Sequence, residues 1–591
     1  MGEEPLPEEV LRELRGYALL NAVEHGGKAV PGPVISKVLG RHPELRTRAK
    51  DVARAAAEAV KEVNSIPLEE QQRILEKEYP ELLQRKVVRV LLGRKGLPPL
   101  PNVDKWGRVR TRFAPNPDFL IHLGNARPAI LSHEYAKMYE GVMILRFEDT
   151  DPKTKPPMPE AYKLIKKDLR WLGVEWQEEY IQSLRMGIYY DMAKELIRRG
   201  GAYVDLCTQE EFRTYKLARK PCPHRNQEID RNLELFEKMI NGHFGEGEAV
   251  LRVKTEITHK DPSVIDWVAF RIIDTDKNPH PIVGSRYAAW PTYNFAAGVD
   301  DHLLQVTHIL RGKEHSINTV KQSYLYAHMG WEYPEVINLG RLKLEGLILS
   351  KSQIKKIMSE SPGRFSGPDD IRFGTIASLR NRGIEAEAIR QIIMDVGAKS
   401  TDAVVSWDNI AAANRKLIDP KTKRLMAVTK PVLLRIKEYG GPAEVTIPNH
   451  PDNQELGKRT IKLVPTGGVL EVYVEAQDME KATRKGGMRL MEFCNVRIED
   501  VSGGVAEGVY AGTSLNDARE KGYSIVQWVP REGSIEAEIV VPEELELRTI
   551  KAVAEPELGM LEKGEKAQLV RFGFIKIQEP GKPVKAVFIH E

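Results

Sequence analysis

Residues 109–147 constrain the fold more than any other stretch, because they fit a strand, a helix and a second strand into under 40 residues. VRTRF at 109–113 alternates apolar and polar side chains, which is typical of a strand, and MILRF at 143–147 is a second short apolar run. A helical pattern extends between them from about 125 to 140. Two strands joined by a crossover helix are parallel, so we predict an α/β sheet covered by helices.

Chain length and changes in the hydrophobic pattern indicate how the rest of the chain is divided into domains. The 591 residues suggest about four domains at roughly 150 residues each. After about residue 425 the hydrophobic period becomes two, as in LEVYVEA and LVRFGFIKI, with Gly and Pro turns between the runs. We predict N-terminal helices at 1–105, an α/β domain in two halves at 106–204 and 263–355, an insertion at 205–262, a helical linker at 356–424 and β-barrels at 425–591.

Composition narrows the class of protein. No run of about 18 apolar residues occurs, so we expect no membrane span. The acidic N-terminus lacks the apolar run of a secretory signal, and three cysteines are too few for a disulfide framework. A net charge of +4 neither requires nor excludes a nucleic-acid partner. We expect a cytoplasmic protein.

The stretch FLIHLGNARP, residues 119–128, lies where the first strand gives way to the helix. Gly124 would allow a close backbone approach, and the free N–H groups of the helix start could bind an anion. His122 could donate to a phosphate oxygen. Taken alone, the stretch fits an ordinary packed turn better, because short glycine motifs often occur without a function.

A second motif changes this interpretation. ILSKS at 348–352 carries a lysine in a Ser-bearing loop after a second α/β run, and lysine is a compact cation suited to phosphate. Together HLGN and ILSKS resemble the HIGH and KMSKS motifs of class I aminoacyl-tRNA synthetases. RTRFAPNP, LRFEDTDP, the stretch at 290–315 and the β-rich C-terminus resemble the archaeal type of glutamyl-tRNA synthetase. The resemblance covers essentially the whole chain.

The resemblance implies a Rossmann-like catalytic domain that ligates glutamate to tRNA through a glutamyl-adenylate, with ATP and Mg²⁺ as cofactors. ATP would bind at His122, Gly124, Asn125, Ser350, Lys351 and Ser352, with His122 and Lys351 on the phosphates. Glutamate would bind at Arg112, Glu148, Tyr293 and Arg311. For each of these residues a structural ion pair or a core aromatic ring is the alternative. Arg311 favours glutamate over glutamine, because a buried arginine without a counter-charge is costly.

The resemblance also implies tRNA(Glu) as a partner. Whether tRNA(Gln) is charged too stays open, and the N-terminal helices could dock a partner protein. Two alternative functions remain: a glutaminyl-tRNA synthetase, and a non-catalytic tRNA-binding paralogue. The chain departs from the family pattern at three places. Asn125 replaces the second histidine of HIGH, and Ile348 replaces the first lysine of KMSKS. DFLI (118–121) replaces a small loop of Ser and Gly.

A zinc site is the one metal hypothesis that the residues raise. Cys207, Cys222 and His224 lie in the insertion with the spacing C-x14-C-x-H. No paired C-x2-C occurs and no fourth ligand is evident, so the spacing does not favour zinc. We therefore predict no metal site in the protein.

Overall fold

The computed structural model describes residues 6–79, 82, 96–348 and 350–591. Its contacts divide the chain into two compact units, Met1–Pro99 and Leu100–Glu591. None of the described helices is both long and apolar enough to cross a membrane.

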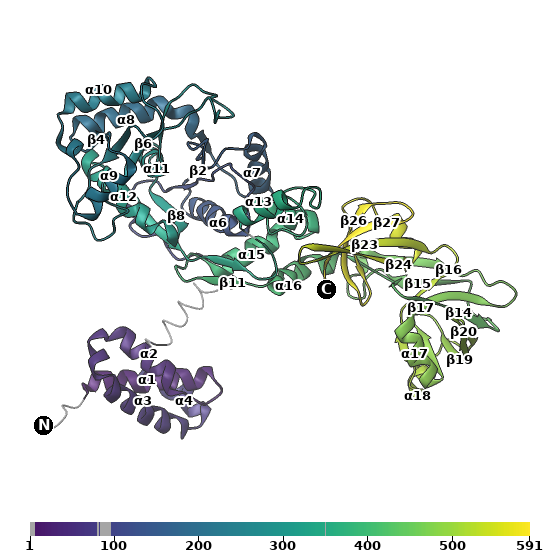
Figure 1. The fold of residues 1–591 in the computed structure, drawn as a ribbon. Coiled ribbons are helices and arrows are strands. Elements are labelled where there is room, and N and C mark those ends of the chain that lie inside the picture. Colours follow the sequence, from purple (N-terminus) through teal and green to yellow (C-terminus); the bar gives the residue numbers. More distant parts are fainter. Residues whose placement is uncertain (1–5, 80–81, 83–95, 349) are drawn as a thin grey trace. The chain divides into compact units, whose positions relative to one another are not determined.

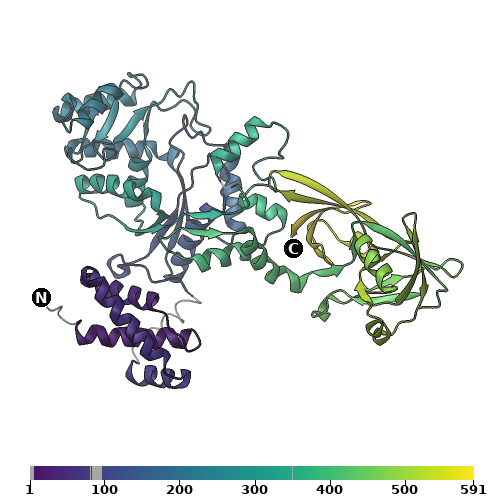
Figure 2. The ribbon, with the colours of Figure 1, turned by 60° about the horizontal axis from the view of Figure 1, so that its bottom comes forward.

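The first unit is a bundle of helices (Figures 1 and 2). They are α1 Glu8–Glu24, α2 Pro31–Arg41, α3 Ala49–Asn64 and α4 Leu68–Glu78, with a 3₁₀ turn at Pro43–Arg48. On α3 the buried residues are Val52, Ala56, Val60 and Val63, which recur at helical spacing and face the core that α1, α2 and α4 share. The unit therefore has a hydrophobic core of its own.

The second unit begins with a five-stranded sheet in the order β3-β2-β1-β8-β9. All its neighbouring strands are parallel: β1 Arg110–Phe113, β2 Val142–Phe147, β3 Glu178–Ile181, β8 His308–Gly312 and β9 Glu335–Leu339. The crossover helices are α6 Leu123–Met138, α7 Pro159–Trp171, α8 Met186–Arg198, α11 Tyr293–Leu303 and α12 Ser316–Met329. The predicted strand–helix–strand unit is confirmed, because β1 and β2 pair in parallel on either side of α6.

A second sheet interrupts this one between β3 and β8. It is antiparallel, in the order β4 Ala202–Asp205, β5 Val250–Val253, β6 Val268–Ile272 and β7 Ala289–Pro291. Helices α9 Gln209–Leu217 and α10 Ile229–Ile240 belong to the same insertion. One continuous core, which includes Trp290, Phe270 and Phe236, joins this sheet to α8 and α11. The inserted sheet thus extends to Pro291 and is anchored on helices of the parallel sheet.

A short helical region follows β9. A parallel ribbon pairs β10 Leu342–Leu344 with β11 Ala403–Val405, and the helices are α13 Lys351–Glu360, α14 Ile376–Arg382, α15 Ala386–Val396 and α16 Trp407–Ile418. The side chain of Arg127, on α6, is buried and donates to the carbonyls of Gly340, Gly397 and Lys399. These bonds tie the helical region to the parallel sheet.

Two seven-stranded sheets complete the unit. The first has the order β12-β25-β26-β27-β23-β24-β13, with bounds Lys423–Leu425, Lys566–Leu569, Gly573–Glu579, Val584–His590, Ile535–Glu543, Glu546–Ala554 and Ala427–Val428. The second has the order β21-β18-β19-β20-β14-β17-β22, with bounds Ser524–Val526, Gly487–Leu490, Asn495–Ser502, Val505–Tyr510, Pro431–Lys437, Leu470–Glu475 and Trp528–Pro530.

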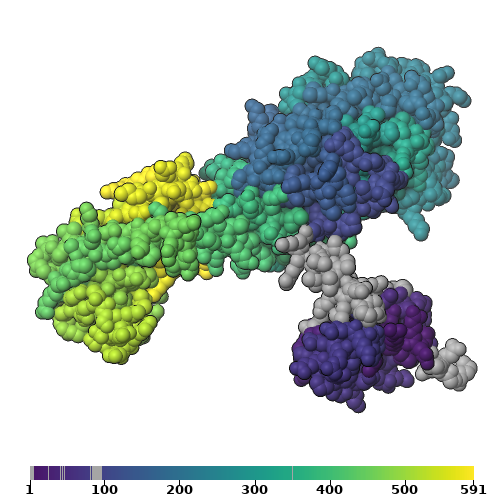
Figure 3. Space-filling model, turned by 180° about the vertical axis from the view of Figure 1, so that it is seen from behind, coloured from purple at the N-terminus to yellow at the C-terminus, as the bar shows by residue number. Residues whose placement is uncertain are grey.

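In both of these sheets the two edge strands are separated by a single residue, Met426 in the first sheet and Gln527 in the second. Such a sheet must curl round on itself, so each is a nearly closed barrel, as the period-two sequence predicts. A separate hairpin pairs β15 Glu444–Pro448 with β16 Lys458–Lys462, and helices α17 Ala476–Lys485 and α18 Leu515–Glu520 flank the second barrel. The barrels lie against each other in the space-filling view (Figure 3).

Candidate functional site

A cleft of about 900 Å³ opens at the carboxyl ends of β1, β2 and β8. This is the edge of a parallel sheet at which ligands bind. Eight of the ten residues predicted for the site line the cleft together: Arg112, His122, Gly124, Asn125, Glu148, Tyr293, Arg311 and Lys351. The remaining two, Ser350 and Ser352, lie beside Lys351 at the start of α13.

His122 caps the N-terminus of α6. Its Nδ1 accepts the backbone N–H of Gly124 at 3.0 Å, and the backbone N–H of His122 donates to Asn125 Oδ1 at 3.2 Å. Burial, and then the charge of Lys351, lower the pKa of His122 to about 4. The ring is therefore neutral at pH 7, and because Nδ1 is an acceptor its proton lies on Nε2. His122 can offer a neutral N–H donor to a ligand.

Gly124 and Asn125 have structural reasons to be where they are. A Cβ at position 124 would lie 2.8 Å from Cε1 of His122, so only glycine leaves room for the ring in this position. Asn125 uses its carbonyl oxygen in the capping box, which leaves its NH₂ group free to donate. The family departure at 125 thus keeps both the cap and a donor.

Ser350 caps α13 by accepting the N–H of Gln353 at 3.4 Å, and its hydroxyl lies 3.0 Å from that of Ser352. The two serines thereby fix the start of the helix from which Lys351 projects. Lys351 Nζ donates to Asp118 Oδ1 at 3.0 Å. Sequence reasoning singled out Asp118 only as a departure from the family pattern and did not find this ion pair.

Four charged side chains form a row of buried ion pairs at the cleft. Glu148 accepts from Arg146 at 2.9 Å, Arg146 donates to Asp301 at 2.7 Å, and Asp301 accepts from Arg112 at 3.2 Å. Burial raises the pKa of Glu148, while Arg146 and Arg112 act against that shift. Arg146 and Asp301 were missed by the sequence analysis, although a charged residue inside the apolar run of β2 is a signal of such a network.

Arg311 is buried but has neutral partners. It donates to Gln322 Oε1 at 3.2 Å, to Thr319 Oγ1 at 2.5 Å and to Tyr333 Oη at 3.2 Å. Among the described residues no carboxylate forms an ion pair with it, and its Nε has no hydrogen-bond partner. A buried cation without an ion-pair partner favours an anionic ligand.

Tyr293 is the first residue of helix α11, and its ring centroid lies 5.7 Å from that of His315. Burial and the neighbouring carboxylate of Glu148 raise its pKa, so the phenol stays protonated and can donate or accept a hydrogen bond. The cleft therefore combines cations, a carboxylate and neutral donors.

At the cysteines the structure adds a group that the sequence analysis did not find. A fourth group, Asp205, lies with Cys207, Cys222 and His224, and one ligand atom from each lies within 4.8 Å of the others. Asp205 is the last residue of β4 and accepts a hydrogen bond from Arg252 at 2.6 Å, a contact that no local spacing could reveal. His224 Nδ1 lies 3.1 Å from Asp205 Oδ1 and 3.4 Å from Cys207 Sγ, so the described groups satisfy one another by hydrogen bonds. Carboxylate, thiol and imidazole are also ligand types that zinc accepts.

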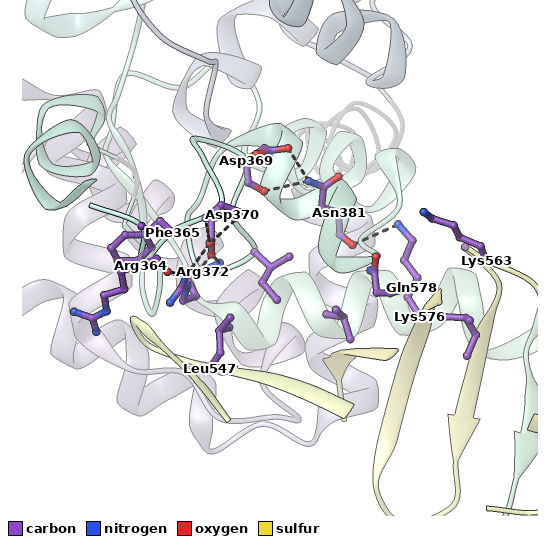
Figure 4. A pocket seen from close by; sticks show the side chains of 16 residues that line it. Arg364, Phe365, Asp369, Asp370, Arg372, Asn381, Leu547, Lys563, Lys576 and Gln578 are labelled. Carbon is purple, nitrogen blue, oxygen red and sulfur yellow. Dashed lines mark hydrogen bonds and ion pairs between the residues drawn. The ribbon is translucent and has the colours of Figure 1, made fainter. Parts of the chain in front are cut away.

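A second hollow, of about 780 Å³, lies between the loop before α14 and the first barrel (Figure 4). Several cations line it, but each of three has a partner in the protein. Arg372 pairs with Asp370 at 2.7 Å, Arg364 pairs with Glu546, and Lys576 donates to the carbonyl of Arg380 at 3.1 Å. Both arginines of this hollow are thus paired with carboxylates, in contrast to Arg311 in the cleft.

Comparison with known proteins agrees with this geometry. The family model described as "tRNA synthetases class I (E and Q), catalytic domain" matches residues 108–420, and the corresponding anticodon-binding domain matches residues 422–513. A curated glutamate–tRNA ligase of Hyperthermus butylicus is 52% identical over 97% of this chain and 100% of its own length. The one from Aeropyrum pernix is 51% identical over 99% and 100%, and the one from Ignicoccus hospitalis is 50% identical over 97% and 98%.

The two family models together span the cleft, the linker helices and the first part of the barrels, and the curated relatives extend the match along nearly the entire chain. The chain belongs to the E and Q branch of the class I tRNA synthetases.

Proposed function

We propose that the protein is an ATP-dependent glutamate–tRNA ligase. The observation that carries the choice of amino acid is Arg311, a buried cation in the cleft with neutral partners. The γ-carboxylate of glutamate supplies the missing negative charge, whereas the amide of glutamine does not. The names of the curated relatives support the same assignment.

In this proposal the substrate glutamate lies along the row of buried ion pairs. Arg311 and Arg112 bind the γ-carboxylate, Tyr293 lines the pocket, and Glu148 attracts the ammonium group. Since Arg112 is already paired with Asp301, its contribution is smaller than that of Arg311. The α-carboxylate is then free to attack phosphorus.

The nucleotide occupies the other end of the cleft, beside the N-terminus of α6. His122 donates from Nε2 and Lys351 from its ammonium group to the phosphates, with Gly124 allowing the adenosine to approach and Asn125 offering its NH₂ group. Ser350 and Ser352 act indirectly by capping α13. We propose Mg²⁺ with ATP, because a divalent cation offsets phosphate charge.

The reaction has two steps. The α-carboxylate of glutamate attacks the α-phosphate of ATP and releases pyrophosphate, which gives glutamyl-adenylate. The acyl group then passes to the terminal adenosine of tRNA(Glu) and AMP leaves. The protein contributes position and charge stabilisation rather than covalent chemistry. We place this activity in the cytoplasm, where tRNA is charged.

The deciding experiment compares glutamate and glutamine in ATP–pyrophosphate exchange with tRNA present. We expect glutamate to be activated and Arg311→Gln to raise KM for glutamate by at least about tenfold, since it removes a charge-assisted pair. A preference of the wild-type protein for glutamine would refute the assignment. Charging purified tRNA(Glu) and tRNA(Gln) in parallel then decides whether the second tRNA is also a substrate.

The rival assignment is a tRNA-binding paralogue without catalysis. Lys351→Ala distinguishes the two, because an enzyme should lose most turnover and still bind tRNA. If the wild-type protein binds tRNA but does not charge it, the protein is the non-catalytic paralogue.

A further inference from the structure

The dipeptide Asp118-Phe119, which departs from the family pattern, lies against one face of α13. Asp118 Oδ1 lies 3.0 Å from Lys351 Nζ, and Asp118 Oδ2 lies 3.6 Å from Lys355 Nζ. Phe119 is buried in one cluster with Ile354, and Lys355 Nζ lies 5.5 Å from the centroid of its ring. Positions 351, 354 and 355 share a helix face, so the dipeptide contacts successive turns of that helix.

The charges at this contact are arranged unevenly. One carboxylate, 15% exposed, faces two lysines, which are 25% and 41% exposed. Lys351 also lines the cleft and lowers the pKa of His122, so its ammonium group lies between Asp118 and the site that we assign to phosphate. Lys355 can keep Asp118 paired if Lys351 turns away.

We propose that Asp118 is a positioning residue that holds Lys351 and α13 in the ATP-free protein and gives Lys351 up to the phosphates when ATP binds. The proposal rests on the nucleotide site proposed above. A triphosphate carries several negative charges and outcompetes one carboxylate, and a partly exposed ion pair is weak enough to exchange. No covalent bond changes in this step, because the Lys351 ammonium group only changes its acceptor.

This proposal makes an unusual prediction for ATP affinity. Removing the charge of Asp118 leaves Lys351 unpaired, so ATP no longer has to displace a carboxylate. Asp118→Asn should therefore bind ATP more tightly, with a Kd about threefold lower at low salt. Damage to the fold of the loop would act in the opposite direction and weaken binding.

The first test measures ATP binding by calorimetry on the full chain for wild type, Asp118→Asn and Asp118→Glu. Asp118→Glu keeps the carboxylate and should restore the wild-type Kd. The matched control is Glu360→Gln, which removes the exposed pair between Lys356 and Glu360 on the same helix. An unchanged or raised Kd in Asp118→Asn, or an equal decrease in Glu360→Gln, would overturn the proposal.

The second test follows hydrogen exchange of the α13 amides without ATP. We expect faster exchange in the first two turns of Asp118→Asn and wild-type exchange there in Glu360→Gln. Equal exchange in all three proteins would contradict a role in holding the helix.

Lys351→Met separates this proposal from the proposed function. If Lys351→Met binds ATP and activates glutamate as the wild type does, the phosphate site itself is wrong and the proposal fails with it. If Lys351→Met is impaired but Asp118→Asn behaves as wild type, the phosphate site stands and only the role of Asp118 fails.

Discussion

At the scale of single residues, the neutral partners of Arg311 matter as much as Arg311 itself. Gln322 is fully buried, accepts from Arg311 and from Tyr333 Oη, and its NH₂ group lies 3.4 Å from the carbonyl of Asn294. A carboxylate at position 322 would neutralise Arg311 from inside the protein. The charge selectivity of the cleft thus depends on an amide that carries no charge.

Gln322→Glu tests this arrangement. We expect KM for glutamate to rise by about 10- to 100-fold. The new carboxylate would pair with Arg311 and so remove about 1.5–3 kcal/mol from the binding free energy of glutamate. KM for ATP should stay unchanged. Tyr333→Phe is the control, since it removes one neutral hydrogen bond to Arg311 and adds no charge. A KM for glutamate within twofold of wild type in Gln322→Glu would contradict the selectivity argument.

His122 allows a second prediction at this scale, on stability against pH. Its pKa is lowered from 6.5 to about 4 in the folded protein, chiefly by burial. Below pH 6.5 the unfolded chain takes up a proton that the folded chain does not, so stability is lost as pH falls from 6.5 toward 4. By pH 5 this histidine should account for a loss of about 2 kcal/mol.

The measurement is the free energy of unfolding in guanidinium chloride at pH 7, 6 and 5. His122→Gln should show a shallower decline than wild type, because it cannot titrate. His243→Gln replaces an exposed histidine and should follow the wild-type curve. Parallel curves for wild type and His122→Gln would show that this imidazole is not held neutral.

At the scale of elements, the turn between β23 and β24 connects the first barrel with helix α13, which carries Lys351. Leu545 in that turn packs into the cluster that contains Phe119 and Ile354, and the Leu545 carbonyl accepts from Arg372 at 3.2 Å and from Arg364 at 3.3 Å. The position of α13 therefore depends on a residue almost two hundred positions further along the chain.

Leu545→Asp is expected to lower kcat for glutamate activation several-fold and to speed hydrogen exchange in α13, because a carboxylate cannot pack in that cluster. Leu547→Asp is a matched control, since Leu547 lies two residues away in β24 and is 42% exposed. It should leave both quantities near wild type. Equal effects of the two substitutions would mean that the turn acts only through general stability.

Local patterns predicted the elements well, because periodicity needs only neighbouring residues. The β1–α6–β2 unit and the barrel character of the C-terminal region follow from periods in the sequence, and the residues of the cleft follow from the motifs. The ion pairs could not be predicted in this way. Asp118 and Lys351 are 233 positions apart, Arg146 and Asp301 are 155 apart, and only the fold brings them together.

At the scale of the whole molecule, the division after Pro99 separates two bodies that each have a hydrophobic core. All eight cleft residues predicted from the motifs, and both barrels, belong to Leu100–Glu591. The N-terminal unit thus contributes no residue to the described cleft lining.

A chain that begins at Leu100 should therefore fold and keep the activation of glutamate, with kcat and KM for ATP and glutamate within about twofold of the full protein. Leu100 must be kept, because its N–H donates to Tyr139 Oη and the next carbonyl, that of Pro101, lies 2.8 Å from His308 Nε2. A chain that begins at Arg110 would lose these contacts and should melt at a lower temperature, so it serves as the comparison. If the chain from Leu100 activates glutamate normally but charges tRNA poorly, the N-terminal helical unit contributes to the use of tRNA. If it fails to activate glutamate while remaining folded, the N-terminal unit is needed for activity in the cleft. The prediction that Leu100–Glu591 activates glutamate on its own would then be wrong.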